Sequence, residues 1–280
     1  HTATLGANSS SGGTITVDGG SLSAGANDFD NTGTMIFTAS GGSTVSVGAF
    51  SSSGTITNSG TNTITASGDV VITGTFGGTA TDGLLRMSGV GTTLNTGVEI
   101  GNLETIGTAT VTAVTNAVDL AGDLSIGNGT SVDLAALGAS ISGDAGGAGS
   151  GALDGGSGAV DVNGDFTVPD YTASSGTTRI GGTTVTFATL DTSAGGTIEL
   201  DGTVGPVGLT TNNQVFNNVS VTTGGGPETV NVVGTLDVDG NLVVAAGHTL
   251  AVGNNVIDVA GTTTNGGTIT LGNQTATFTG

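Results

Sequence analysis

Apolar and polar residues alternate with a period of two along most of this chain, in short runs separated by Gly, Ser, Asn and Asp. One nine-residue pattern recurs: apolar, any, apolar, any, Gly, Asp or Asn, apolar, any, apolar. It occupies residues 64–72, 118–126, 160–168 and 236–244. Alternation of this kind places the apolar side chains of each half on one face of a β-strand. We therefore interpret each copy as two short strands joined at the Gly, which supplies a left-handed or tight-turn conformation between them.

The spacing of these copies indicates how the repeats are organised. They start at residues 64, 118, 160 and 236, so the intervals are 54, 42 and 76 residues. Repetition with uneven spacing predicts a stack of coils of about 20 residues that carry insertions of different length at their corners. The Gly-rich run 143–158 is the clearest such insertion. We expect it to protrude as a corner loop from a single domain spanning 1–280, and a linker between two domains is the alternative.

Two all-β architectures fit the alternation. The dipeptides Asn163-Gly164 and Asp239-Gly240 are typical of two-residue hairpin turns, which would build an antiparallel sandwich. The other two copies carry Ser-Gly and Ala-Gly, which lack the preferred first residue of that turn and suit a bend between coils. Repetition of the whole pattern favours a parallel β-solenoid, or β-helix, with irregular coils. Aromatic residues are only 3% of the chain, and we expect small apolar residues to fill the narrow core.

Charge excludes several partners. The chain has 22 acidic residues against Arg86 and Arg179 as its only cations, which gives a formal net charge of −20. Two arginines cannot neutralise a phosphate backbone, so nucleic acid is excluded, and an acidic membrane would repel this surface. The apolar runs are far shorter than the roughly 20 residues that span a bilayer, so we expect no membrane insertion. Cysteine is absent, and stability must come from packing and hydrogen bonds.

The C-terminal part of the chain carries a family resemblance. The run FNNVSV at 216–221 is followed by GTLDVDGNLVVAAGHTLAVGNNVIDVAGTTTNGGTITLGNQTATFTG at 234–280. This stretch resembles the β-strand repeats of filamentous-haemagglutinin-like adhesins and autotransporter passenger regions of bacteria. The resemblance implies a secreted, extracellular β-solenoid that serves as a stalk, an adhesin or a filament at the cell surface. It carries over no catalytic residue.

Candidate catalytic groups are few. The histidines are His1, at the first position, and His248, which we expect to be exposed in a turn. Polysaccharide-active β-helix enzymes use clustered Asp, Arg and Lys with aromatic sugar platforms, whereas this chain has no Lys or Trp and Tyr171 as its single tyrosine. We therefore predict that the chain is not an enzyme, and we assign no catalytic or cofactor-binding residue. Thr-x-Thr pairs such as Thr55/Thr57 suggest ice binding, but uneven coils would spoil a flat array.

Calcium is the one cofactor that the sequence raises as a hypothesis. Alternate oxygen donors of the kind that Ca²⁺ prefers occur twice, with a further pair at Asp28 and Asp30. The two sets are Asp161, Asn163 and Asp165, and Asp237, Asp239 and Asn241. The twelfth-position Glu of a helix-loop-helix site is missing from both, where Thr172 and His248 stand instead. The alternative is that these side chains simply lie on the outer face beside a turn, and no metal site is assigned.

The two ends of the sequence complete the functional hypothesis. Residues 1–6 and 267–280 follow the strand pattern, and we see no charged or helical cap in either segment. A chain that begins at His1 is expected to be processed, or excised from a longer stalk. We predict a structural extracellular subunit, on the order of 60 Å long, that stacks head to tail on copies of itself into a filament. The alternative is the stalk or binding segment of an adhesin with a glycan or cell-surface partner, and a polysaccharide-active enzyme or an ice-binding protein is less favoured.

Overall fold

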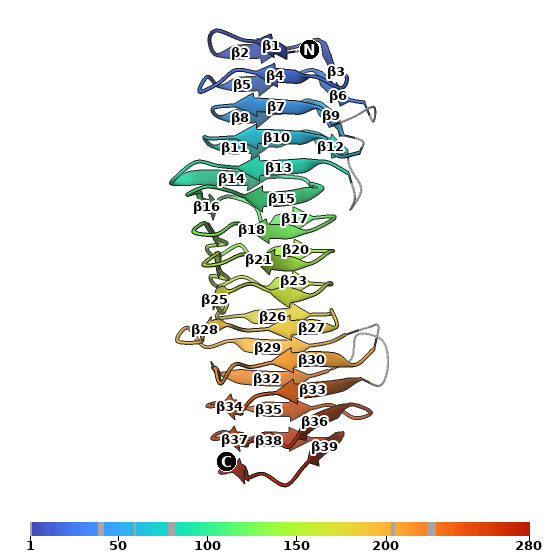
Figure 1. Ribbon diagram of the computed structural model, residues 1–280, viewed down its shortest axis with the longest axis vertical. Coiled ribbons are helices and arrows are strands. Elements are labelled where there is room, and N and C mark those ends of the chain that lie inside the picture. Colours follow the sequence, from blue (N-terminus) through green and yellow to red (C-terminus); the bar gives the residue numbers. More distant parts are fainter. Residues whose placement is uncertain (1, 39–41, 59, 78–81, 203–204, 223–227) are drawn as a thin grey trace.

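The protein is a stack of parallel β-strands. The computed structural model describes residues 2–38, 42–58, 60–77, 82–202, 205–222 and 228–280 (Figure 1). The regular elements in these ranges are all strands, and no helix in them is long and apolar enough to cross a membrane. Strands that neighbour each other in a sheet run parallel and lie one turn apart in the sequence. The β-solenoid prediction is confirmed, and the antiparallel sandwich is wrong.

Three faces wind around the stack in a constant order, and each turn contributes one strand to face 1. Face 1 is a 14-stranded sheet. Its strands are β1 (Thr2–Thr4), β4 (Ser21–Ser23), β7 (Thr44–Val47), β10 (Thr63–Ala66), β13 (Leu84–Met87), β15 (Asn102–Thr105), β18 (Leu124–Ile126), β21 (Ala145–Gly147), β24 (Phe166–Thr167), β27 (Thr184–Thr186), β30 (Val207–Thr210), β33 (Thr229–Val233), β36 (Thr249–Gly253) and β39 (Thr268–Leu271).

Face 2 follows face 1 in every turn. It consists of a 10-stranded sheet continued by a 4-stranded sheet, and the two meet where the Thr192 hydroxyl donates to the Val215 carbonyl. Its strands are β2 (Ser9–Ser11), β5 (Phe29–Asn31), β8 (Phe50–Ser52), β11 (Val70–Ile72), β14 (Thr92–Thr96), β16 (Thr110–Ala113), β19 (Ser131–Asp133), β22 (Ala152–Asp154), β25 (Asp170–Thr172), β28 (Thr189–Asp191), β31 (Val215–Phe216), β34 (Leu236–Val238), β37 (Ile257–Val259) and β40 (Ala276–Phe278).

Face 3 closes each turn. It begins as a 4-stranded sheet and resumes as an 8-stranded sheet, and in the turn between them the isolated bridge from Ile100 to Leu120 takes the place of a strand. Its strands are β3 (Thr14–Val17), β6 (Thr34–Phe37), β9 (Thr55–Asn58), β12 (Thr75–Gly77), β17 (Val118–Leu120), β20 (Ala139–Ile141), β23 (Val160–Val162), β26 (Thr177–Ile180), β29 (Thr197–Leu200), β32 (Asn218–Val221), β35 (Leu242–Val244) and β38 (Thr263–Asn265).

Turn length varies, as the uneven motif spacing predicts. Along face 1 the register partners Leu84 and Asn102 are 18 residues apart, whereas Thr184 and Gly208 are 24 apart. The extra residues lie at the corners, so the strands themselves stay in register. For the same reason the Thr column of face 3 remains continuous through four turns, from Thr14 to Thr75. The expectation that uneven coils spoil such an array is therefore wrong.

The prediction for residues 143–158 is also wrong. This run does not protrude but forms the strands β21 and β22 inside the stack. Leu124, Ala145 and Phe166 are successive register partners spaced by 21 residues, so this turn has no insertion. The run is rich in Gly because neighbouring turns leave little room at its corners. A Cβ on Gly151, for example, would lie 2.8 Å from the Ile126 carbonyl oxygen.

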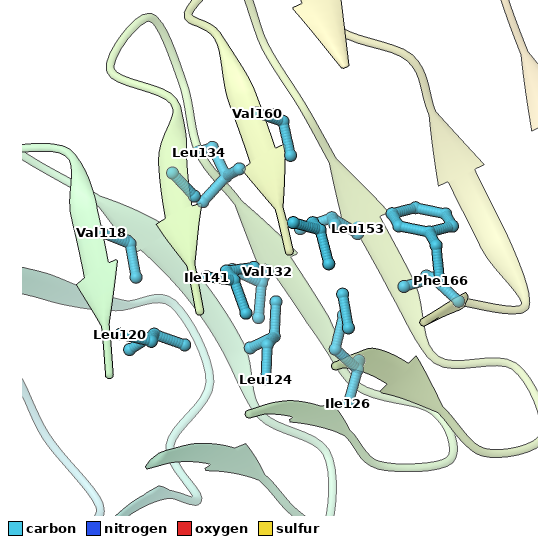
Figure 2. Packing of buried hydrophobic residues seen from close by; sticks show 14 of the residues in the cluster. Val118, Leu120, Leu124, Ile126, Val132, Leu134, Ile141, Leu153, Val160 and Phe166 are labelled. Carbon is cyan, nitrogen blue, oxygen red and sulfur yellow. The ribbon is translucent and has the colours of Figure 1, made fainter. Parts of the chain in front are cut away.

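Inward-pointing residues form one continuous core. Figure 2 shows Val118 and Leu120 of β17 gathered with Leu124 and Ile126 of β18 in the space between the faces, and all four are buried. The expectation that small residues alone fill this space needs correction, because eight of the nine aromatic residues are buried as well. Their rings contact one another from turn to turn, with centroids 4.9 Å apart for the pair Phe166 and Tyr171. Aromatic rings therefore pack along the axis of the stack, where successive turns supply neighbouring rings.

Candidate functional site

A ladder of Asn and Asp side chains runs along the corner between face 3 and face 1. Asn102, Asp123, Asp144 and Asp165 each follow a Gly and lie one turn apart, with 21 residues between successive members. The Oδ1 atom of each accepts the backbone N–H of the next, at 2.8, 2.9 and 2.8 Å. Asp165 ends this corner ladder by accepting the N–H of both Thr183 and Thr184 at 2.8 Å. The ladder satisfies backbone donors that a sheet cannot pair where the chain turns.

The Gly before each ladder residue is required by space. A Cβ on Gly164 would lie 2.2 Å from Oδ1 of Asp144 and 2.5 Å from the Gly143 carbonyl oxygen. The prediction that these glycines supply a left-handed conformation is wrong, since the central Gly of none of the four motif copies has a positive φ. The turn below occupies the position that a Cβ would need.

Other corners carry shorter ladders of the same kind. Between faces 2 and 3, Asn218 Oδ1 accepts the N–H of Asn241, whose own Oδ1 accepts the N–H of Thr262, both at 2.9 Å. Between faces 1 and 2, Asp28 Oδ1 accepts the N–H of Ala49 at 3.0 Å. The four copies of the motif accordingly lie at three different corners. The pattern therefore marks any corner at which a side chain bridges two turns.

The first calcium candidate is divided between two structural roles. Asp161 lies on the outer side of face 3, where its Oδ2 is 3.9 Å from Nη1 of Arg179. Asp165 belongs to the corner ladder and uses Oδ1 to accept two backbone N–H groups. The backbone N–H of Asn163 pairs with the Ile141 carbonyl one turn below. The structure thus places two of the three residues against other protein groups, and calcium here stays a hypothesis that chelation tests.

The second calcium candidate is divided in the same way. Asn241 belongs to the ladder between faces 2 and 3, whereas Asp237 lies on face 2 opposite Asp258. Burial, followed by repulsion from Asp239 and Asp258, raises the pKa of Asp237. Within the ranges that the structure describes, no three His, Cys, Asp or Glu side chains lie close enough to hold a metal ion. The sequence spacing did not bring the predicted donors to one point, because alternate residues of a strand end at a corner with a different direction.

Both arginines join neighbouring turns. Arg86 Nε lies 2.6 Å from Glu104 Oε2 on face 1. Arg179 on face 3 has Nε 3.1 Å from Glu199 Oε1 and 3.3 Å from Asp201 Oδ2. The hydrogen bond and the charge of Glu199 are the main reasons that the pKa of Arg179 is raised. Each cation therefore offsets like-charge repulsion between carboxylates that the ladder register places side by side.

Glu228 and His248 form a buried polar pair that the sequence did not reveal. They precede β33 and β36 at the corner between faces 3 and 1, and their side chains are only 4% and 1% exposed. The Glu228 backbone N–H donates to Nδ1 of His248 at 3.3 Å, which keeps this nitrogen unprotonated. The expectation of an exposed His248 is wrong, because this corner position points into the stack. Neither group is accessible to a substrate in this arrangement.

The Glu228 carboxyl group is held in an environment that disfavours its charge. It lies against Gly202, where a Cβ would be 2.1 Å from Oε1, and neither carboxyl oxygen has a well-aligned hydrogen bond. Burial, and then the charge of Asp201, raise the pKa of Glu228 to about 7, although the nearby Gly202 N–H offsets part of the rise. Burial also raises the pKa of Asp201, against the attraction of Arg179. This corner is therefore the part of the described chain most sensitive to neutral pH.

The outer surface has one further feature of interest, a shallow groove of about 360 Å³ on face 1. Its polar lining includes Asn62, Asn102 and Asp123, together with the ion pair of Arg86 and Glu104. These groups can donate and accept hydrogen bonds to a polar ligand, but no aromatic side chain lines the groove.

Sequence reasoning missed the corner ladder, although a signal for it exists. The dipeptides Gly101-Asn102, Gly122-Asp123, Gly143-Asp144 and Gly164-Asp165 recur every 21 residues. The third of these belongs to a hidden motif copy at 139–147, in which Gly147 stands at the last apolar position. Searching for the Gly-Asn/Asp dipeptide alone would have found it.

Comparison of the chain with models of known protein families, with curated proteins and with solved structures found no match. The resemblance to adhesin and autotransporter repeats accordingly rests on the strand pattern of the sequence, and what the structure establishes is a β-solenoid repeat protein.

Proposed function

We propose that this chain is a structural protein of the cell surface, a subunit that stacks head to tail into an extracellular filament. The observation that carries the proposal is the 14-stranded ladder of face 1, which runs from the first described turn to the last (Figure 1). Such a stack is a rod whose long axis lies along its backbone hydrogen bonds. Its function is mechanical, since each turn is joined to the next on three sides.

Several features favour a role exposed to pulling and to proteases. Backbone ladders on three faces and side-chain ladders at the corners resist separation of the turns. Arg86 and Arg179 are the only sites for a trypsin-like protease, and both lie within strands and are ion-paired. The strong negative charge of the flanks keeps neighbouring rods apart. Extracellular location follows from the same resemblance in strand pattern that the C-terminal sequence carries.

A second candidate is the stalk or binding segment of an adhesin, and the groove on face 1 favours it. Asn62, Asn102 and Asp123 could hydrogen-bond a glycan there, with the ion pair of Arg86 and Glu104 beside it. The lack of an aromatic platform predicts weak binding. A glycan or a host protein would be the partner in this case.

Sedimentation velocity and negative-stain electron microscopy of the purified chain separate these candidates. The filament subunit is expected to sediment faster as its concentration rises and to form unbranched rods. A chain that stays monomeric at every concentration, and that binds glycans in a manner sensitive to Asn102→Ala, would instead support the adhesin stalk. Asn95→Ala, on the outer side of face 2, is the matched control for that substitution.

A further inference from the structure

The two end turns of the solenoid share a geometry and a lack of charge that specify how copies would meet. We propose that a second copy of this chain docks in one rotational register, with face 1 on face 1, face 2 on face 2 and face 3 on face 3. The inference rests on the proposed function, because it names the contact through which filament subunits join.

The strand order supports this register. The first turn presents β1, β2 and β3 as the unpaired edges of faces 1, 2 and 3. The last strands of the same faces are β39, β40 and β38, and each pairs with only one neighbour among the described residues. The strands at both ends run in the same direction around the axis, since every stacking step within the molecule is parallel. Placing a copy on this end therefore continues three parallel ladders at once, whereas any other rotation continues none.

Charge supports an end-to-end contact over a side-by-side one. All 22 acidic residues and both arginines lie between Asp18 and Asp258. Residues 2–17 and 259–280 contain no Asp, Glu, Lys or Arg. Two copies that meet through their ends bring neutral turns together, whereas two copies side by side bring acidic flanks together. Repulsion between like charges thus disfavours the lateral contact and leaves the axial one open.

Apolar groups complete the match. Phe278 is the single exposed aromatic residue, at 41%, and its register partner Val259 is buried in the core. Phe278 thus occupies an inward column that no described turn covers. Leu271 of β39 is 44% exposed, and at the opposite end Leu5 and Ile15 are only partly buried against the core. A second copy would cover these side chains as each internal turn covers those of its neighbour.

Cysteine pairs test the register, because the chain has no cysteine of its own. The double variant Ser10→Cys/Thr277→Cys places one thiol on face 2 of the first turn and one on face 2 of the last turn. The matched control Thr16→Cys/Thr277→Cys moves the first thiol to face 3. Filaments of each variant are treated with a short bis-maleimide and separated on a denaturing gel, after thermal melting has shown that both variants fold.

The face 2 pair is expected to give a ladder of covalent multimers several-fold stronger than that of the control. Equal ladders from filaments of both variants, or a stronger ladder from the control, would overturn the register and leave the proposed filament intact. Absence of filaments from the unaltered chain would overturn both.

A substitution at the end turn tests the neutral contact independently. Leu271→Asp is expected to raise the concentration needed for filament growth about tenfold or more, since the docked copy would bury a carboxylate. Val233→Asp, at a position 56% exposed on the flank of face 1, is the control and should leave that concentration unchanged. An equal effect of both substitutions would contradict an end-to-end contact.

Discussion

At the scale of single residues, the corners of this molecule depend on the absence of a Cβ. Gly164 packs against Oδ1 of Asp144 and the carbonyl of Gly143, and the Asp that follows it bridges to the next turn. The sequence shows the Gly-Asp dipeptide plainly, but its reason cannot be read there. A glycine needed for close approach and a glycine needed for a positive φ look alike until the neighbouring turn is known.

Replacing Gly164 by Ala should therefore be costly. We expect Gly164→Ala to lower the free energy of unfolding by about 2 kcal/mol or more, because the new Cβ forces neighbouring turns apart. Gly208→Ala is the control, since its Cβ would meet only the Thr183 carbonyl oxygen at 3.7 Å. Denaturant unfolding measures both. Equal stability of the two variants would show that close approach is not what the corner requires.

Glu228 makes stability depend on pH in a stated direction. Its pKa is about 7 in the folded chain against an ordinary 4.5, so the folded state holds this proton more tightly. No penalty exists below pH 4.5, where both states are protonated. Stability falls between pH 4.5 and about 7, and the full penalty remains above that range. Glu228→Gln should remove the penalty and raise the free energy of unfolding at pH 8 by on the order of 2 kcal/mol.

The measurement is thermal or denaturant unfolding of the unaltered chain and of Glu228→Gln across pH 4 to 8. Glu99→Gln, at an exposed position, controls for the loss of one carboxyl group. Curves for Glu228→Gln and the unaltered chain that stay parallel over this whole range would refute a buried, proton-binding Glu228.

At the scale of elements, strand existence was predictable and corner geometry was not. Alternation with period two identified segments such as 236–244 as strand pairs, because the inward positions must be apolar wherever a turn is covered on both sides. It failed at 143–158, where Ala145 and Gly147 take inward positions without a strong apolar signal. It also failed for His248, because burial at a corner depends on how the chain bends. The calcium candidates failed to converge for the same reason.

The ion pairs belong to this scale, since they join strands of neighbouring turns. Arg179→Met should leave Asp161, Glu199 and Asp201 without their shared cation and lower the free energy of unfolding by about 1 kcal/mol, because the guanidinium is partly exposed. The loss should shrink at high salt, which screens the remaining carboxylates. Arg86→Met, which removes a cation with one partner, is the control and should show a smaller salt dependence. A loss independent of salt would assign the effect to packing instead.

At the scale of the whole molecule, the three-faced rod brings together two properties that the sequence already separates. Acidic residues occupy the flanks between Asp18 and Asp258, and the end turns are neutral. The sequence alone predicted end-to-end assembly from strand-like ends. It could not specify a rotation, because the constant order of the three faces appears only once the strands are paired. With that order known, assembly becomes a continuation of the stacking that already holds the molecule together.

Cryo-electron microscopy of filaments grown from the pure chain tests this account most directly. We predict strands perpendicular to the filament axis, three faces that continue without rotation across the junction, and one subunit for roughly every 60–70 Å of length, as about 14 turns spaced by about 4.8 Å require. A reconstruction in which the rods lie side by side, or in which junctions rotate one face onto another, would contradict it.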